Sequence, residues 1–290
     1  EKLAKKHGVG PESIIITGGS TEGLKIAGLT FAHNGGEIIA GQPTFLAMMD
    51  YAKQWGASIQ WVPVGADKGY DLDAIENRIS SQTKMIFLCN PNNPTGTLLP
   101  AQKLKDFCQS ISQKTIVFSD EAYYDFIEEE NYPSMDTLVR DGQNVIVSKT
   151  FSKVYGLAGL RIGYLIAKPE LAAQIRKNVV AMSNVLAIAA ADAALQDDAF
   201  YSFSLAKNRE AKSKIYALLD HLKLDYVPSS TNFVFFHAQK DIRSLGPQMH
   251  EKGVRIGRPF PPFYDWCRIS TGTLEEVDRF VAGMLEVYQG

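Results

Sequence analysis

The chain has 290 residues, which is enough for one large domain or two domains of ordinary size. Apolar residues make up 45% of it and charged residues 21%, values typical of soluble globular proteins, which argues against a disordered or fibrous protein. Because 30 lysines and arginines face 32 aspartates and glutamates, the net charge of -2 gives no general attraction to nucleic acid or to an anionic membrane. We therefore expect no nucleic-acid or membrane partner.

The cysteine pattern favours a protein of a reducing compartment. Cys89, Cys108 and Cys267 are odd in number, widely spaced and set in apolar sequence, so they predict buried thiols in a cytoplasmic protein, with no disulfide and no metal site. No stretch approaches the roughly 18 apolar residues of a membrane helix. The chain opens at Glu1 on a helical pattern without an initiating Met, so we expect a native segment to precede it.

The first part of the chain alternates short apolar runs with helical patterns. Seven runs are candidate strands: residues 13–17, 37–40, 58–62, 84–89, 115–119, 144–148 and 161–166. Several of them are apolar throughout, as expected for strands covered on both faces in a mostly parallel sheet. This rhythm predicts a three-layer α/β/α sandwich with a mostly parallel seven-stranded sheet over about residues 11–170.

After Lys168 and Pro169 the pattern changes. Helical stretches over residues 170–196 and 201–222 are followed by a strand over 232–236 and by a final helix after Thr273. These elements predict a smaller α+β C-terminal domain. We expect a large domain over residues 1–175 and a small domain over 176–290, with the boundary inside a helix.

Ligands of open α/β sheets bind beyond the carboxyl ends of the strands, so the residues that follow each strand are the candidate site. The first strand is followed by Gly18-Gly19-Ser20-Thr21-Glu22-Gly23 and a helix. Glycine amides, the hydroxyls of Ser20 and Thr21 and the amino end of a helix could cradle a phosphate. The same residues could equally be a simple helix cap.

The fourth and fifth strands are followed by polar residues. In Asn90-Pro91-Asn92-Asn93-Pro94-Thr95-Gly96, two prolines stiffen a turn whose amide side chains could donate to a ligand oxygen at little reorganisation cost. In Asp120-Glu121-Ala122-Tyr123-Tyr124, an aspartate after an apolar strand needs a cationic or donor partner. It could cap a turn, or it could hold a protonated heterocyclic nitrogen while the phenol of Tyr123 holds an adjacent oxygen.

The sixth strand leads into residues 149–161, where two lysines, two hydroxyls and an arginine lie among apolar residues and glycines. A lysine in such surroundings is a candidate for a lowered pKa and for attack on an aldehyde. Spacing alone does not choose between Lys149 and Lys153. One cofactor, pyridoxal phosphate, would use all four loops, since it presents an aldehyde, a phosphate, a phenolic oxygen and a pyridine nitrogen.

The order of GGSTEG, NPNNPTG, DEAYY and TFSKVYGLAGLRIGY resembles that of fold-type I pyridoxal-phosphate-dependent aminotransferases of class I/II, most closely the histidinol-phosphate aminotransferase group. The resemblance implies that Lys153 binds the cofactor aldehyde, that Asp120 partners the pyridine nitrogen and that Tyr123 and Asn93 donate to the phenolic oxygen. It also implies that Phe45 stacks on the ring. The remaining residues that it assigns, all to the phosphate, are Arg161, Thr150, Ser152, Ser20 and Thr21.

In the second domain, residues 266–273 (WCRISTGT) resemble the segment that carries the substrate-carboxylate arginine, which implies that Arg268 clamps this carboxylate. Asn232 could assist there or cap a turn. Histidinol phosphate needs a second anion site, for which Arg258 or Arg255 is the candidate. The loop around Arg258 carries what looks like one inserted residue relative to the family's usual run.

The resemblance implies a transaminase that moves an amino group from an amino acid or histidinol phosphate to a 2-oxo acid such as 2-oxoglutarate. It also implies a homodimer with shared active sites and an N-terminal segment that closes over the substrate. Phe260, Phe263 and Tyr264 would suit an aromatic amino acid equally well. Further alternatives are a decarboxylase or β-lyase of the same fold and a non-catalytic pyridoxal-phosphate-binding domain.

Overall fold

The computed structural model describes residues 1–289, and its larger sheet has the seven predicted strands. In spatial order β1-β7-β6-β5-β4-β2-β3, these are Ile14–Thr17, Gly163–Ala167, Val145–Thr150, Ile116–Asp120, Thr83–Cys89, Glu37–Gln42 and Ser58–Pro63. β7 is antiparallel to both of its neighbours, and the other strands run in one direction. The predicted mostly parallel sheet is confirmed. β7 begins two residues later than expected, because Arg161 takes a left-handed backbone conformation.

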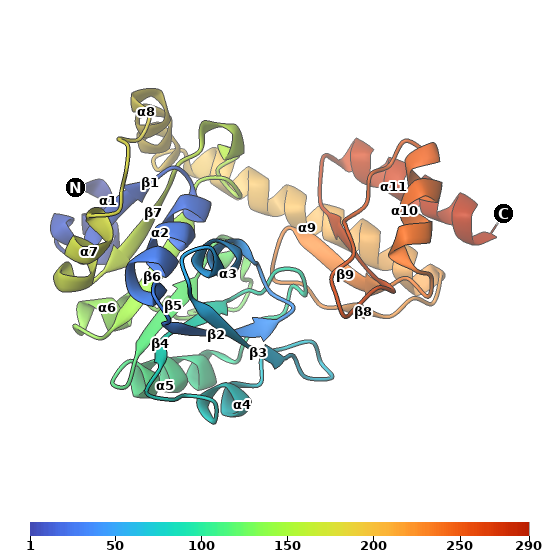
Figure 1. Ribbon diagram of the computed structural model, residues 1–290. Helices are drawn as coiled ribbons and strands as arrows, with labels where there is room; N and C mark the ends of the chain where they lie inside the picture. Colours follow the sequence, from blue (N-terminus) through green and yellow to red (C-terminus); the bar gives the residue numbers. More distant parts are fainter. Residues whose placement is uncertain (290) are drawn as a thin grey trace.

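Helices cover both faces of this sheet (Figure 1). One face packs against α2 (Ser20–Ala32), α3 (Ala47–Lys53) and α7 (Pro169–Arg176). The other packs against α4 (Leu72–Glu76), α5 (Ala101–Ile111) and α6 (Asp136–Arg140), with α1 (Lys2–His7) and α8 (Val185–Ala194) nearby. Successive side chains of β4 point alternately to the two layers and are buried on both sides, which explains the continuous apolar runs of the sequence.

The C-terminal part forms the smaller α+β unit that the sequence predicts. Its antiparallel sheet has β10 (Trp266–Ser270), β9 (Phe233–His237) and β8 (Tyr226–Val227) in that order. α9 (Asp198–His221), α10 (Ile242–Glu251) and α11 (Leu274–Gln289) share one apolar core with it. Figure 1 shows α9 running from the side of the large sheet to the small one.

The expectation of one helix over residues 170–196 is wrong. α7 ends at Arg176, and α8 begins only at Val185. The side chain of Asn184 accepts a hydrogen bond from the amide of Leu186 and so caps α8, and asparagine and serine in this stretch are poor residues for a helix interior. The boundary at residue 175 therefore falls close to the end of a helix, and it stays a prediction.

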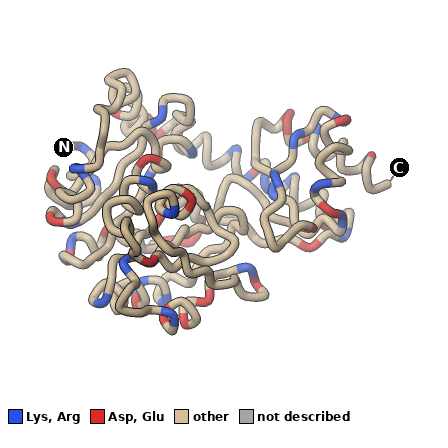
Figure 2. The backbone as a smooth tube through the Cα atoms, viewed as in Figure 1, with Lys and Arg blue, Asp and Glu red and all other residues tan. Residues whose placement is uncertain are grey.

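The three cysteines are buried as free thiols, as predicted. Lysine and arginine alternate with aspartate and glutamate over both parts of the molecule, without a large region of one sign (Figure 2). Among the helices of residues 1–289, none has the length and apolarity needed to cross a membrane.

Candidate active site

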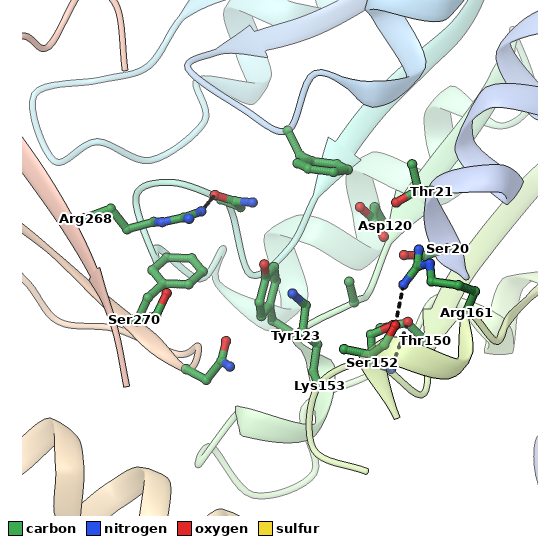
Figure 3. A pocket seen from close by; sticks show the side chains of 16 residues that line it. Ser20, Thr21, Asp120, Tyr123, Thr150, Ser152, Lys153, Arg161, Arg268 and Ser270 are labelled. Carbon is green, nitrogen blue, oxygen red and sulfur yellow. Dashed lines mark hydrogen bonds between the residues drawn. The ribbon is translucent and has the colours of Figure 1, made fainter. Parts of the chain in front are cut away.

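A cavity of about 300 Å³ lies where the loops that follow β1, β4, β5 and β6 meet the small domain. Every predicted site residue lines it except the two candidates for the second anion site, Arg255 and Arg258. The predicted residues that line it are Ser20, Thr21, Phe45, Asn93, Asp120, Tyr123, Thr150, Ser152, Lys153, Arg161, Asn232 and Arg268. Figure 3 shows side chains from both domains converging on this space.

Sheet register explains why segments far apart in the sequence meet here. Asp120 is the last residue of β5, where it pairs with Cys89 of β4 on one side and with Ser148 of β6 on the other. Thr150 is the last residue of β6. Because β4, β5 and β6 are parallel, their carboxyl ends share one edge of the sheet, and the loops that follow them project to the same side.

One end of the cavity is an anion cradle. Ser20 and Thr21 form the amino end of α2, where the helix dipole and unpaired amides favour a negative charge. The guanidinium of Arg161 lies against Gly19, and a Cβ atom at Gly19 would come within 2.6 Å of its Nη2. Arg161 Nη1 donates to the Ala158 carbonyl at 2.8 Å, and in the described part of the chain this arginine has no carboxylate partner. A phosphate bound in the cradle would give Arg161 an anionic partner.

Gly163, which was not among the predicted site residues, supports this cradle. It pairs with Thr17 of β1 on one side and with Thr150 of β6 on the other. A Cβ atom there would lie 2.6 Å from the amide nitrogen of Ser20 and 2.9 Å from the carbonyl oxygen of Lys149. A glycine inside a strand often marks such a close backbone approach, so this signal was present in the sequence.

Asp120 also lines the cavity, with 2% of its surface exposed. Burial raises the pKa of this carboxyl group to about 7, although the nearby Lys153 ammonium acts to lower it. Its Oδ1 atom is buried and has no hydrogen-bond partner in the described part of the chain. A buried carboxylate with an unused oxygen can accept a proton-bearing nitrogen from a ligand.

The two candidate lysines lie in different surroundings. Lys153 lies in the cavity beside Tyr123, with its Nζ 5.1 Å from the centroid of that ring. Burial, followed by the positive charge of Arg268, lowers the pKa of Lys153, and no carboxylate of residues 1–289 forms an ion pair with it. Lys149 does not line the cavity, since its Nζ lies 2.7 Å from Glu121 Oε2 in a buried ion pair. The structure therefore places one nucleophilic amine in the site.

Two polar groups stand between Asp120 and the small domain. Tyr123 is buried, with its ring edge-on to Phe233 at a centroid distance of 5.2 Å, and burial raises the pKa of its phenol. It can therefore act as a hydrogen-bond donor at neutral pH. Asn93 accepts a hydrogen bond at its Oδ1 from Arg268 Nη1, at 2.7 Å, which joins the two domains across the cavity. Its amide NH₂ stays available to a ligand oxygen.

The small domain contributes an arginine held between aromatic rings. Arg268 lies inside β10, and its guanidinium carbon is 5.1 Å from the Phe233 centroid and 5.2 Å from the Phe260 centroid. Burial lowers its pKa, and its Nε is buried without a partner in the described residues. An anionic ligand group could use this donor. Phe233 and Ser270 also line the cavity, although the sequence analysis assigned them no role.

Arg258 lies outside the cavity on the exposed surface. Its Nη1 donates to the Pro259 carbonyl at 2.9 Å, and its guanidinium carbon lies 4.5 Å from the Phe260 ring centroid. Arg268 contacts the same ring, so both arginines pack against Phe260. Arg255 lines a separate depression in the small domain.

Comparison with known proteins points to one family. The family model described as aminotransferase class I and II matches residues 1–284. The histidinol-phosphate aminotransferase of Moorella thermoacetica is 38% identical over 296 residues, which cover 99% of this chain and 75% of the relative. The histidinol-phosphate aminotransferase of Halalkalibacterium halodurans is 34% identical over 290 residues, which cover 99% of this chain and 78% of that relative. The solved histidinol-phosphate aminotransferase of Sinorhizobium meliloti in complex with pyridoxal-5'-phosphate has a TM-score of 0.90 and 29% identity, over 99% of this chain and 79% of that one.

Proposed function

Because the chain belongs to the aminotransferase class I and II family, we propose that it is a pyridoxal-phosphate-dependent histidinol-phosphate transaminase that uses a 2-oxo acid such as 2-oxoglutarate as the amino acceptor. The resemblance inferred from its four loop motifs is confirmed by the match to the family. The observation that carries the proposal is the convergence of an unpaired lysine, a buried carboxylate and an anion cradle in one cavity.

The residues of the cavity fit pyridoxal phosphate. Asp120 has an unused buried oxygen for the ring nitrogen, Lys153 has an unpaired amine for the aldehyde, and the loop at Ser20 with Arg161 suits the phosphate. Asn93 and Tyr123 can donate to the phenolic oxygen, and Phe45 offers an aromatic face. When bound, this cofactor supplies a cationic ring that draws electrons from the substrate Cα.

Lys153 is the proposed base. Because its pKa is lowered, a larger share of the side chain is the neutral amine at neutral pH, and only the neutral amine can attack an aldehyde or accept a proton. With the cofactor bound, the free amine of Lys153 would be the base that takes the proton from the substrate Cα and returns it. Asp120 would hold the protonated ring nitrogen.

Arg268 is the proposed anchor of the substrate. Its guanidinium can bind the carboxylate of the 2-oxo acid in a two-pronged arrangement. Histidinol phosphate carries a phosphate ester where an amino acid carries that carboxylate, and a phosphate bears more negative charge at pH 7. Arg258, which packs against the same Phe260 ring as Arg268, is the proposed second cation for this group.

An aromatic amino acid aminotransferase is the second candidate. Phe235, Phe260, Phe263 and Trp266 form an aromatic cluster beside Arg268, and such a surface accepts a phenyl or phenol ring as readily as an imidazole.

We also propose that the protein is a cytoplasmic homodimer with domains over residues 1–175 and 176–290. Support for association comes from a group of apolar side chains on and before α8, where Val180, Met182, Val185 and Leu186 are between 74% and 96% exposed. The buried free thiols support a reducing compartment.

A substrate panel tests the function. The purified protein is loaded with pyridoxal phosphate and given histidinol phosphate, phenylalanine, tyrosine or aspartate, each with 2-oxoglutarate. We expect one glutamate per donor consumed, with kcat/KM for histidinol phosphate exceeding the others by about tenfold or more. A preference for phenylalanine or tyrosine would favour the second candidate. Release of CO₂ or of a β-substituent would indicate another enzyme of this fold, and cofactor binding without turnover would leave a non-catalytic domain.

A further inference from the structure

A buried ion pair lies directly behind the cavity floor. Lys149 Nζ is 2.7 Å from Glu121 Oε2 and 3.9 Å from the centroid of the Tyr124 ring. The two side chains of the ion pair are only 12% and 3% exposed. The proposed function uses neither of them, although buried charges are costly and are seldom kept without a partner.

The pair and the cofactor residues occupy opposite faces of the same two strand ends. Asp120 and Glu121 are consecutive, as are Lys149 and Thr150, and the Glu121 amide donates to the Ser148 carbonyl at 2.9 Å, so the strand pairing continues through Glu121. Successive side chains of a strand point to opposite faces. Asp120 and Thr150 line the cavity, and Glu121 and Lys149 do not.

Glu121 has hydrogen-bond partners at both carboxylate oxygens. Its carboxylate accepts hydrogen bonds from the Met135 amide at 2.8 Å and from the Ser134 hydroxyl at 2.7 Å, besides its contact with Lys149. Two buried carboxylates therefore occupy adjacent positions, 120 and 121, and only Glu121 has a cation of its own.

We propose that Lys149 is a positioning residue that neutralises Glu121, so that Asp120 titrates free of its neighbour's charge and stays able to bind a protonated ring nitrogen. This role rests on the proposed function, which assigns the ring nitrogen to Asp120. An unpaired charge on Glu121 would favour the protonated form of Asp120, in the same direction that Glu121 already acts on the pKa of this residue.

The other titratable groups near the two carboxylates do not change between the variants proposed below. Those near Asp120 are Lys153, Cys89, Tyr70 and Tyr123, and those near Glu121 are Tyr124, Tyr132, Tyr164 and Cys108. On the side of Lys149 lies Asp136, whose pKa is lowered, against the effect of burial, by its pair with His7 at 2.6 Å and by the Lys149 ammonium. The tyrosines and cysteines here have a pKa raised by burial, so they remain neutral in the range in which Asp120 titrates.

A charge cycle on the cofactor-free protein tests the proposal. Lys149→Met, Glu121→Gln and the double variant are labelled with ¹³C at aspartate side-chain carboxyl carbons, and the Asp120 resonance, assigned by its loss in Asp120→Asn, is followed against pH. We expect the pH at which Asp120 is half protonated, its titration midpoint, to rise by about one unit in Lys149→Met and to fall in Glu121→Gln. In the double variant it should return to the wild-type value. A rise of one unit from about 7 would cut the ionised fraction at pH 7 from about one half to about one tenth, and so weaken the apparent pyridoxal-phosphate Kd about fivefold.

A merely structural role for the pair predicts a different pattern. Both single variants would then unfold at lower temperature, with Asp120 midpoints unchanged or shifted the same way, and this would overturn the proposal. If Lys149→Met does not fold, the other two variants decide. The pH midpoint of the Asp120 titration should then be lower in Glu121→Gln than in the wild type and should return to the wild-type value in the double variant. An unchanged midpoint in Glu121→Gln would refute the proposal. The titration needs no turnover, so failure of the substrate panel would overturn the proposed function without affecting this result.

Discussion

The two walls of the cavity are built in different ways. On the large-domain wall, Asp120, Thr150 and Lys153 stand at or just beyond the ends of parallel strands, where the topology of the sheet fixes their position. On the small-domain wall, Arg268 projects from within an antiparallel strand, and Arg258 lies on a loop at the surface. The first wall follows from a general rule of α/β sheets, while the second depends on the packing of particular aromatic side chains. In our proposal the first wall would hold the cofactor and the second wall would select the substrate.

Removal of the lysine should affect the first wall most. Lys153→Ala removes the amine that we propose binds the cofactor and moves the proton, so we expect kcat to fall by about 10⁴-fold or more. The absorbance band of the lysine-linked cofactor should disappear as well. Lys103→Ala is the matched control, because Lys103 is exposed and pairs only with Asp73 at the surface. Retention of both the band and turnover in Lys153→Ala would remove Lys153 from its proposed role.

Asp120→Asn should raise stability while it lowers activity. The pKa of Asp120 is about 7 in the folded protein against 3.8 ordinarily, so the folded state binds more protons between these pH values and loses stability as the pH rises through this range. In cofactor-free protein, Asp120→Asn should therefore exceed the wild type in unfolding free energy by about 4 kcal/mol at pH 8, and the difference should vanish near pH 4. Urea unfolding at several pH values measures this.

The catalytic half of this prediction is measured separately. With pyridoxal phosphate bound, the same variant should lose about 10² to 10³-fold in kcat, because a neutral amide does not keep the ring nitrogen protonated. An unchanged rate would argue against Asp120 as the partner of that nitrogen.

On the second wall, Arg268→Lys should weaken substrate binding and leave the cofactor in place. Lysine keeps the charge but loses the planar pair of donors, so kcat/KM for the 2-oxo acid should fall by about 10- to 100-fold, mostly through KM. The cofactor spectrum should match that of the wild type. A comparable loss of cofactor would mean that the two walls do not act separately.

The smallest effect is expected at the surface of the second wall. Arg258→Ala should lower kcat/KM for histidinol phosphate by about three- to tenfold and leave that for phenylalanine within about twofold, because an exposed cation contributes little unless the ligand is highly charged. Equal losses for both donors would show that Arg258 does not distinguish the phosphate.

Sequence reasoning predicted the first wall almost completely. The strands were visible as apolar runs, and the rule that parallel strands end at one edge was enough to place together the loops that carry Ser20, Asn93, Asp120 and the two candidate lysines. The choice between Lys149 and Lys153 could not be made from spacing, because it depends on which face of β6 meets Glu121.

The second wall was less accessible to sequence reasoning. Arg268 was found only through a family motif, and its position inside β10 was missed. The residues Phe233 and Ser270 were also missed, since nothing local shows which face of a short antiparallel strand meets a ligand. The break between α7 and α8 was missed because the apolar pattern continues across it.

Gly163 shows how a change in the scaffold can alter ligand affinity. It does not line the cavity, yet a methyl group there must push the Ser20 amide away from the cradle or separate β7 from β6. The substitution Gly163→Ala could therefore be mistaken for a mild folding defect. We expect instead that it weakens phosphate binding at the cradle, so that a higher concentration of pyridoxal phosphate would offset it.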